Sequence, residues 1–360
     1  MVNESFNWKL LYENPVLVYG AGIMARAVSK MLLHTKANLL GMAVTSLSKS
    51  DKEDCEGIKI CCLEDWQNYA ENAVVLIATS YCYHEEIKQN CIAHGFNNVI
   101  SMNKEVVFES FRNYFSAKDI SLDNKTITIQ NGNYINPIIE TVPVPELLFA
   151  CLGDFVIPSV FNDYSMIHEG PYEYGSVKLS EGDLVLDLGA NMGIFSVFAV
   201  SKGCTSYAFD PTPELKETIE LHSKLNNNKI HYEPYAVSNK SGQAKFCIDP
   251  FSCAANSLFD EMLVNGGKNA STLVVSQISV DEFVEQERLE KVDFIKADIE
   301  GAERLMLEGS KNTLKKFAPK LALCTYHLPN DKEVMTDLIL KANPNYKIEY
   351  KWDKLYAYVE

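Results

Sequence analysis

Residues 182–193 read Gly-Asp-Leu-Val-Leu-Asp-Leu-Gly-Ala-Asn-Met-Gly and decide the fold of the C-terminal half. An apolar run that ends in a glycine-rich turn and continues as an apolar helical pattern predicts a strand, a tight turn and a helix. Similar patterns alternate toward the C-terminus, which is typical of a parallel sheet covered by helices. We predict strands at 183–188, 206–209, 229–237, 292–297 and 320–326, and helices at 194–202, 214–225, 303–316 and 331–342.

The charges around this turn indicate which ligand it holds. Asp187 precedes Gly189 by two positions, where a carboxylate would repel a pyrophosphate and favour a ligand that bears an ammonium and a sulfonium. Asp210 closes the next strand, and its two oxygens suit the two hydroxyls of a ribose. Both residues fit S-adenosylmethionine. The alternative is that Asp187 caps the helix and Asp210 only opens the turn at Pro211.

A second acidic stretch, residues 292–303, reads Val-Asp-Phe-Ile-Lys-Ala-Asp-Ile-Glu-Gly-Ala-Glu. Lys296 lies in an otherwise apolar strand and needs an acidic partner, for which Asp298 is close enough. Asp298 and Glu300 should emerge at the same crevice as Asp187, since the carboxyl ends of parallel strands share one edge. The alternative is that Glu300 and Glu303 merely favour the N-terminus of a helix.

Four segments together resemble the FkbM family of S-adenosylmethionine-dependent methyltransferases. They are the turn at 182–193, Phe-Asp-Pro at 209–211, Ala-Val-Ser at 236–238 and Asp-Phe-Ile-Lys-Ala-Asp-Ile-Glu-Gly-Ala-Glu at 293–303. The resemblance covers about residues 160–330. It implies the class I methyltransferase fold, whose seven-stranded sheet ends in an antiparallel hairpin, and the runs 346–350 and 355–359 agree. It also implies O-methyl transfer to sugars or secondary metabolites.

The expected cofactor residues follow from these segments: Asp187, Gly189, Ala190, Asn191, Gly193, Asp210, Pro211 and Ala236. Asn191 stands where a glycine is frequent, and it tolerates a positive φ better than most residues. Methyl transfer from a sulfonium depends mainly on alignment and exclusion of water. Near the acceptor oxygen we place Asp298, Glu300 and His327, of which His327 should titrate near neutral pH. Two carboxylates are not a specific metal signature, so we assign no metal.

Further residues could contact the adenine or the acceptor. Residues 241–281 occupy the place where class I enzymes often build acceptor contacts, and a segment of this length is either functional or mobile. Candidates for a lid there are Phe251, Asn256, Ser257 and Phe259. Aromatic residues before the first strand could cover the adenine or cradle a sugar, or could equally well be core: Tyr164, Tyr172 and Tyr174.

The N-terminal part contains a second turn of this kind, Gly20-Ala21-Gly22, after an apolar run. Strands predicted at 38–44 and 73–78 and a helix at 85–94 complete a Rossmann-like unit. No acidic residue follows the second strand, which argues against NAD. The layout is similar to the nucleotide-sugar-binding half of bacterial sugar acyltransferases. Two roles stay open: a nucleotide or nucleotide-sugar site, or a structural or dimerising domain.

Length and composition bound the answer. The 360 residues suggest two domains, with boundaries predicted at 1–105, 106–170 (a connector packing on the second domain) and 171–360. A net charge of -15 argues against nucleic acid as partner. The ten cysteines form no C-x-x-C pair, so they should be reduced and apolar rather than zinc ligands. We expect a cytoplasmic protein that does not enter a membrane.

The sequence therefore predicts an α/β chain of two Rossmann-like domains that methylates a hydroxyl of a sugar, nucleotide-sugar or glycan. Two alternatives stay open. One is an NAD(P)-dependent sugar oxidoreductase that uses the Gly20 turn. The other is a non-catalytic protein that binds nucleotide-sugars on the same fold.

Overall fold

The computed structural model describes residues 9–34, 36–47, 54–55, 57–79, 83–102, 120–122, 126–129, 132–135, 171–248, 256–259 and 271–360. The chain divides into two compact units. The first comprises Met1–Lys125 and Asn136–Ile167, and the second Thr126–Ile135 and His168–Glu360. The boundaries expected at residues 105 and 170 remain predictions.

The first unit contains a six-stranded sheet of order β3-β4-β2-β1-β5-β6. All neighbours are parallel except β3 and β4. Strands β1 and β5 are buried along their whole length, as their continuous apolar sequences predict. The elements are α1 (Leu10–Glu13), β1 (Val16–Tyr19), α2 (Ile23–His34), β2 (Leu39–Val44), β3 (Asp54–Cys55), β4 (Ile58–Cys62), η1 (Leu63–Tyr69), β5 (Val74–Ile77), α3 (His84–Ala93), β6 (Asn98–Ser101) and β7 (Ile120–Leu122).

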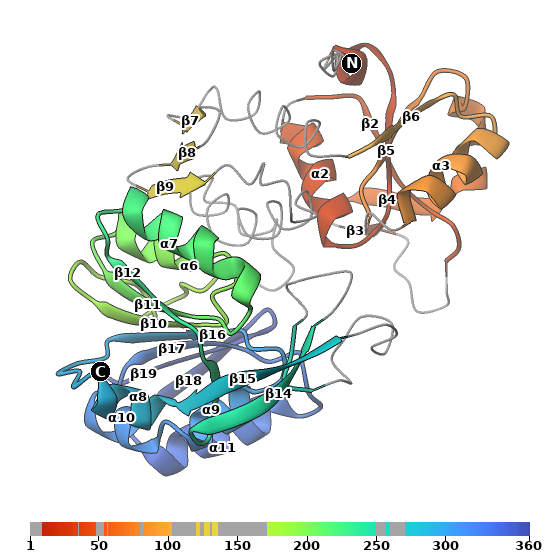
Figure 1. Cartoon of the computed structure of the whole chain (residues 1–360). Coiled ribbons are helices and arrows are strands. Elements are labelled where there is room, and N and C mark those ends of the chain that lie inside the picture. Colours follow the sequence, from red (N-terminus) through yellow and green to blue (C-terminus); the bar gives the residue numbers. More distant parts are fainter. Residues whose placement is uncertain are drawn as a thin grey trace. The chain divides into compact units, whose positions relative to one another are not determined.

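The second unit contains a seven-stranded sheet of order β12-β11-β10-β16-β17-β19-β18 (Figure 1). Its first five strands are parallel, and β19 runs antiparallel to both β17 and β18. This confirms the predicted sheet and its terminal hairpin. The strands are β10 (Leu184–Leu188), β11 (Thr205–Phe209), β12 (Ile230–Glu233), β16 (Phe294–Ala297), β17 (Lys320–Cys324), β18 (Lys347–Lys351) and β19 (Lys354–Tyr358).

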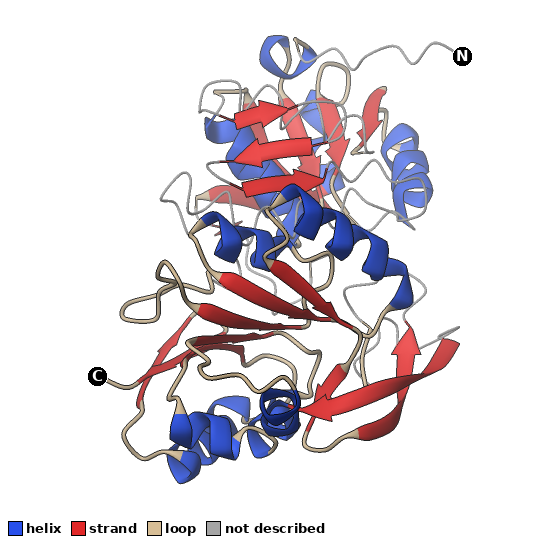
Figure 2. Ribbon diagram, turned by 60° about the vertical axis from the view of Figure 1, so that its left-hand side comes forward, coloured by secondary structure: helices blue, strands red, loops and turns tan. Residues whose placement is uncertain are grey.

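Helices cover both faces of this sheet. Figures 1 and 2 show α6 and α7 on one face and α8 to α11 on the other. The main core lies under the second group and includes Leu186, Phe283, Ile295 and Leu323, all buried. The helices are α6 (Ile194–Ser201), η4 (Pro213–Leu215), α7 (Lys216–Leu225), α8 (Val280–Gln286), α9 (Glu303–Glu308), α10 (Lys311–Lys316) and α11 (Asp331–Ala342).

Two predicted elements of this unit are each divided in two. The strand predicted at 229–237 is β12 in the main sheet and β13 (Ala236–Ser238) in a small separate sheet, with Pro234 between them. Proline has no N–H to continue a ladder. The helix predicted at 303–316 is divided into α9 and α10 around Gly309, where a Cβ would lie 2.6 Å from the carbonyl oxygen of Ser238, so that only glycine fits this close contact. The first break thus follows from a local residue, whereas the contact at Gly309 is tertiary and is not contained in the local pattern.

Apolar patterns at 243–248 and 272–278 also predict strands, and these form a small sheet of order β13-β15-β14, with β14 at Gly242–Ile248 and β15 at Ser271–Ser279. The sequence Asn131-Gly132-Asn133 is typical of a hairpin turn, and strands β8 (Thr126–Ile129) and β9 (Gly132–Ile135) do pair antiparallel. Throughout the described residues, no helix is both long and apolar enough to cross a membrane. The cysteine side chains that the structure describes are all free thiols.

Candidate active site

The glycine turn joins β10 to α6 at the carboxyl edge of the sheet. Strand β10 lies between β11 and β16, so the strand order changes direction beside this turn, which is where α/β sheets bind ligands. Gly189 has φ +72°, and a Cβ on it would lie 1.9 Å from the carbonyl oxygen of Asp298. No side chain fits there. Asn191 (φ +51°) and Gly193 (φ +79°) also have a left-handed backbone. This confirms the positive φ that asparagine was expected to tolerate at position 191.

Hydrogen bonds tie the turn to the end of β11. The carbonyl oxygen of Phe209 accepts from the N–H groups of Gly189 (3.0 Å) and Ala190 (2.9 Å). Asp210 Oδ2 accepts from the N–H of Asn191 (2.9 Å), and its Oδ1 accepts from that of Thr212 (2.9 Å). Burial outweighs these bonds and raises the pKa of Asp210 to about 6. Each carboxylate oxygen has two lone pairs, so Asp210 can still accept from a ligand hydroxyl.

The structure corrects the expected role of Asp187. This side chain is fully buried, and its Oδ1 lies 3.1 Å from Lys296 Nζ, while its Oδ2 accepts from Ser196 Oγ (2.7 Å). Its charge is therefore neutralised inside the sheet and does not face a cation in the crevice. The parallel register places Asp187 directly beside Lys296, so the partner of Lys296 is Asp187 and not Asp298.

Lys296 links this buried pair to the turn. Its ammonium donates to the carbonyl oxygens of Leu188 (3.3 Å) and Gly189 (2.6 Å). Burial lowers the pKa of Lys296, but the negative charges of Asp187 and Asp298 outweigh it and raise that pKa overall. The lysine therefore stays charged and fixes the backbone of the turn from below.

His222 on α7 also holds the backbone of the glycine turn, and it is not among the predicted site residues. Its Nδ1 donates to the carbonyl oxygen of Met192 (2.7 Å), and the residue is 1% exposed. Burial lowers the pKa of His222 to about 4, against the opposing effect of the bond to Met192. The imidazole is therefore neutral at pH 7. The only feature of the sequence that points to His222 is a histidine on the apolar face of the predicted helix 214–225.

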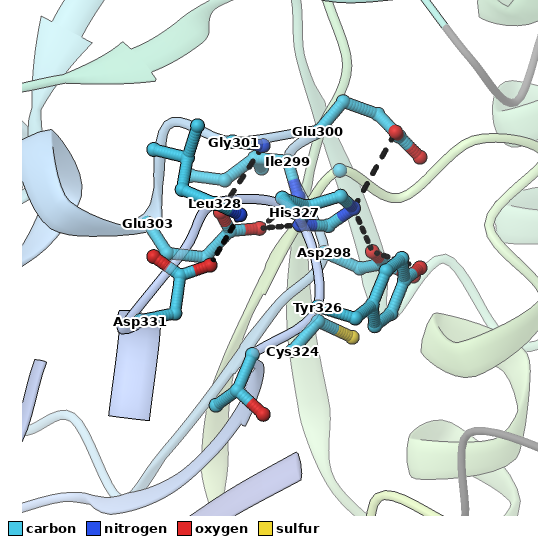
Figure 3. Close-up of polar contacts among 12 residues, drawn as sticks. Asp298, Ile299, Glu300, Gly301, Glu303, Cys324, Tyr326, His327, Leu328 and Asp331 are labelled. Atoms are coloured by element: carbon cyan, nitrogen blue, oxygen red, sulfur yellow. Dashed lines mark hydrogen bonds and ion pairs between the residues drawn. The ribbon is translucent and has the colours of Figure 1, made fainter. Parts of the chain in front are cut away.

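The three residues predicted near the acceptor do come together. Asp298 and Glu300 follow β16, and His327 follows β17, the neighbouring parallel strand. His327 Nε2 lies 3.6 Å from Asp298 Oδ1 and 3.4 Å from Glu300 Oε2. Figure 3 shows the three side chains pointing toward one another. The two carboxylate side chains are 23% exposed, while that of His327 is 4% exposed.

Glu303 holds His327 from the opposite side. Its Oε1 lies 3.1 Å from His327 Nδ1, and the residue is 1% exposed. The same carboxylate accepts from the N–H groups of Ile299 (2.8 Å) and Gly301 (3.1 Å). These bonds stabilise the sharp bend after β16, where Glu300 has φ +50°. Glu303 therefore does more than favour a helix N-terminus, which the sequence analysis offered as its alternative.

The charges of the cluster correct the expected titration of His327. Burial alone would lower its pKa, but Glu300, Glu303 and Asp298 raise it to about 11. The imidazole is therefore a cation at neutral pH and not the base expected from its ordinary pKa. Burial and the charge of Asp298 raise the pKa of Glu300 to about 7, against the effect of His327. Among the three, Glu300 is the group suited to accept a proton near pH 7.

Aromatic side chains surround Asp298. Tyr172 OH donates to Asp298 Oδ2 (2.8 Å), and Tyr326 OH donates to Asp298 Oδ1 (3.2 Å). Lys354 Nζ lies 4.3 Å from the centroid of the Tyr172 ring. Burial would raise the pKa of Asp298, but Lys296, His327 and Lys354 lower it. Asp298 is therefore ionised, and Tyr326, which is 41% exposed, forms the open side of the cluster.

The other predicted contacts divide into two groups. Asn256 Nδ2 donates to Thr212 Oγ1 (3.2 Å), and Ser257 Oγ donates to the carbonyl oxygen of Glu300 (2.7 Å). These residues therefore adjoin both the Asp210 turn and the acidic cluster. Tyr174 is half-buried and packs on Tyr356 (5.3 Å between centroids) and on Trp352 (5.5 Å). Phe251 and Tyr164 lie outside the described residues, whereas the N–H of Phe259 donates to Ser257 Oγ (3.0 Å).

Two more cofactor candidates and the N-terminal turn can be placed. Pro211 follows Asp210 directly, and Ala236 opens β13, where it is 5% exposed and packs with Phe246 and Val275. In the first unit, Gly20, Ala21 and Gly22 connect β1 to α2. Gly20 has φ +127°, and a Cβ on it would lie 2.7 Å from the carbonyl oxygen of Ala78. Arg26 Nε donates to the carbonyl oxygen of Ala21 (2.9 Å).

Part of the chain is similar to a known protein family. Residues 187–348 match the family described as methyltransferase FkbM domain, and this stretch contains Asp187, Asp210 and the whole acidic cluster. The N-terminal unit lies outside the match.

Two characterised proteins are similar over part of the chain. The hexuronic acid methyltransferase AglP of Haloferax volcanii is 27% identical over 168 residues, which are 46% of this chain and 64% of AglP. The 31-O-demethyl-FK506 methyltransferase FkbM of Streptomyces tacrolimicus is 22% identical over 206 residues, 49% of this chain and 77% of that protein. The chain thus spans less than two thirds of the length of AglP.

Among solved structures, the methyltransferase FkbM from Methylobacillus flagellatus KT is 17% identical, with a TM-score of 0.41. The superposition covers 96% of this chain and 90% of that one.

Proposed function

We propose that this chain, whose residues 187–348 are a methyltransferase FkbM domain, transfers a methyl group from S-adenosylmethionine to a hydroxyl of a sugar, nucleotide-sugar or glycan. One observation carries the proposal. The glycine turn at the switch point of the sheet and the cluster of Asp298, Glu300 and His327 share a wall, because the backbone of Asp298 lies against Gly189. Cofactor and acceptor would therefore meet at the ends of β10 and β16.

The residues of the turn fit the cofactor. Asn191 Oδ1 is buried and has no hydrogen-bond partner among the described residues, so it is available to a donor of the ligand. Asp210 would accept from the ribose hydroxyls with its remaining lone pairs. S-adenosylmethionine supplies a methyl group already activated on a sulfonium. Gly189 and Gly193 would let it approach the backbone closely.

The acidic cluster would position the acceptor and receive its proton. A hydroxyl placed beside Glu300 can give its proton to that carboxylate, whose pKa of about 7 is matched to neutral pH. Glu300 is neutral once it has taken the proton, and the protonated His327 then balances the remaining negative charge of Asp298. Tyr172 and Tyr326 hold Asp298 in place by donating to both of its oxygens.

The acceptor class rests on two supports. AglP is by its name a methyltransferase of hexuronic acid. In this chain, Tyr326 offers an exposed aromatic ring beside polar groups, which suits the apolar face and the hydroxyls of a sugar. No observation favours the oxidoreductase or the non-catalytic alternative. A nucleotide-sugar site in the N-terminal unit stays a prediction, as does homo-oligomer formation.

The proposal is tested by methyl transfer from S-adenosylmethionine labelled in its methyl group. The acceptors are hexuronic acids, their nucleoside-diphosphate forms and, for contrast, a nucleic acid. We expect label in a sugar as an alkali-stable ether. Glu300→Gln should lower kcat by about 100-fold or more, the usual contribution of a general base, without loss of S-adenosylhomocysteine binding. Glu333→Gln, an exposed change on α11, is the control. Label in no sugar, or full activity of Glu300→Gln, would contradict the proposal.

A further inference from the structure

We propose that Asp298, Glu300 and His327 also bind a divalent first-row transition-metal ion, for which Mn²⁺ is the probe. This inference rests on the proposed function only in placing the ion beside the acceptor hydroxyl, because binding of the ion can be measured without turnover. Two carboxylates were no metal signature in the sequence. The structure adds a third donor, the imidazole of His327 from the neighbouring strand, whose Nε2 proton the ion would displace into solvent on binding.

The donor atoms have the spacing that an ion needs. One ligand atom from each residue lies within 4.8 Å of the other two, and His327 Nε2 is 3.4 Å and 3.6 Å from the two carboxylate oxygens. Ligands about 2.1 Å from a common ion, at angles between octahedral and tetrahedral, lie roughly 3.0–3.5 Å apart. Small rotations of the partly exposed carboxylates would therefore complete the site.

An independent observation concerns His327 itself. Its side chain is 4% exposed, and within the described part of the chain neither ring nitrogen makes a hydrogen bond of good geometry. Its Nε2 is aimed between Asp298 and Glu300, as Figure 3 shows. A buried nitrogen that faces two carboxylates without a well-directed hydrogen bond to either needs an explanation, and a bound ion would supply one.

The surrounding residues also match a metal centre. A histidine that binds a metal almost always directs its other nitrogen at a carboxylate or carbonyl, and Glu303 lies 3.1 Å from Nδ1. Glu303 is in turn fixed by two backbone N–H groups. On the other side, Tyr172 and Tyr326 orient Asp298 by donating to it. Each ligand is thus held by a second group, except Glu300, which the strained backbone at φ +50° positions.

The donor set indicates the class of ion. Imidazole suits Zn²⁺, Fe²⁺ and their neighbours, and carboxylates suit Mn²⁺, so this mixed donor set fits a first-row ion better than it fits Mg²⁺ or Ca²⁺, which prefer oxygen alone. Two carboxylates balance the charge of the ion, while the positive charge of nearby Lys354 limits its affinity. The open side at Tyr326 leaves coordination positions for water or for a sugar hydroxyl. A hydroxyl bound there would lose its proton more readily, and the proton would pass to the oxygen of Glu300 that does not bind the ion.

The test is a titration of the chelator-treated full chain with Mn²⁺, followed by electron paramagnetic resonance of the free ion. We expect one ion per chain. His327→Gln and Glu300→Gln should weaken binding by about tenfold or more, whereas Glu333→Gln should bind like the wild type. S-adenosylhomocysteine binding by each variant shows that it is folded. The proposal would be overturned if the wild type did not reduce the signal of free Mn²⁺. It would also be overturned if His327→Gln and Glu300→Gln bound Mn²⁺ as tightly as the wild type.

A second measurement needs no variant. The spectrum of Mn²⁺ bound to the wild type should show hyperfine coupling to one nitrogen, from His327. Absence of that coupling would overturn the site as drawn. The inference can also fail alone: methyl transfer that persists in chelator, in a protein that binds no Mn²⁺, contradicts the metal site and leaves the proposed function standing.

Discussion

The chain contains two glycine turns that begin in the same way and end in different surroundings. Gly20 after β1 and Gly189 after β10 both have a positive φ, and in both a Cβ would collide with a backbone carbonyl. Around Gly189 lie the buried pair of Asp187 and Lys296 and the carboxylate of Asp210. Around Gly20 the described contacts include the guanidinium of Arg26 on the carbonyl oxygen of Ala21 (2.9 Å) and Tyr19 OH to Thr45 Oγ1 (2.8 Å), and they include no carboxylate.

The difference separates what glycine contributes from what charge contributes. Glycine permits the tight turn and the close approach of the backbone, and both turns have that. A ligand with hydroxyls and cationic groups needs acceptors as well, and only the turn at Gly189 has a carboxylate, Asp210, at the end of the adjacent strand. A glycine pattern alone therefore predicts a turn, and the residues at neighbouring strand ends predict the ligand.

The largest expected effect comes from breaking the charge pair beneath the Gly189 turn. Lys296→Met leaves Asp187 buried and unpaired, so we expect the free energy of unfolding to fall by about 3–5 kcal/mol. The double variant with Asp187→Leu removes both charges and should recover most of that loss. Urea unfolding measures both. A single variant within about 1 kcal/mol of the wild type would show that the pair is not buried as described.

Adding one methyl group to each turn sharpens the comparison. Gly189→Ala forces a Cβ against the Asp298 carbonyl in a left-handed backbone, which should cost about 2–5 kcal/mol of unfolding free energy. Gly22→Ala meets nothing within 4 Å and has no positive φ, so its effect should be close to zero. Thermal and urea unfolding compare the two. Equal effects would refute the close contact between Gly189 and Asp298.

The pH dependence of stability tests how His222 braces the turn. Its pKa is about 4 in the folded chain and 6.5 when exposed, so the unfolded state binds more protons between these values. Stability therefore falls as pH decreases through this window, by about 2 kcal/mol from pH 7.5 to pH 5 for this group. His222→Gln removes this titratable group. The difference between the unfolding free energies of the two proteins at each pH therefore reports His222 alone, because the other groups contribute equally to both. The same pH dependence in both proteins would contradict a buried neutral imidazole.

Much of the site could be predicted, because it follows from strand ends. The turn at Gly189, the ends of β10, β11, β16 and β17, and the meeting of Asp298, Glu300 and His327 all depend on strand and turn patterns and on parallel order. The partner of Lys296 could not be predicted, because it depends on which strand lies beside β16.

The electrostatic properties were also beyond the sequence. His327 was expected to titrate near neutral pH, and three carboxylates from a different part of the chain raise its pKa to about 11. Likewise, the close contact of Gly309 with Ser238 depends on the small sheet packing against α9, which the local pattern of residues 303–316 does not contain. Local patterns therefore predict where the site residues lie, whereas charged groups distant in the sequence determine their pKa values.

The most direct test determines which of the two glycine turns binds the adenosine and the amino-acid chain of the cofactor. Calorimetric titration with S-adenosylhomocysteine compares the wild type with Asp210→Ala and Gly22→Glu, the second of which enters open space in the N-terminal turn. We predict one site per chain, a loss of affinity of about tenfold or more, which is about 1.4 kcal/mol, in Asp210→Ala, and unchanged affinity in Gly22→Glu. Affinity within twofold of wild type in Asp210→Ala, or lost in Gly22→Glu, would contradict the account.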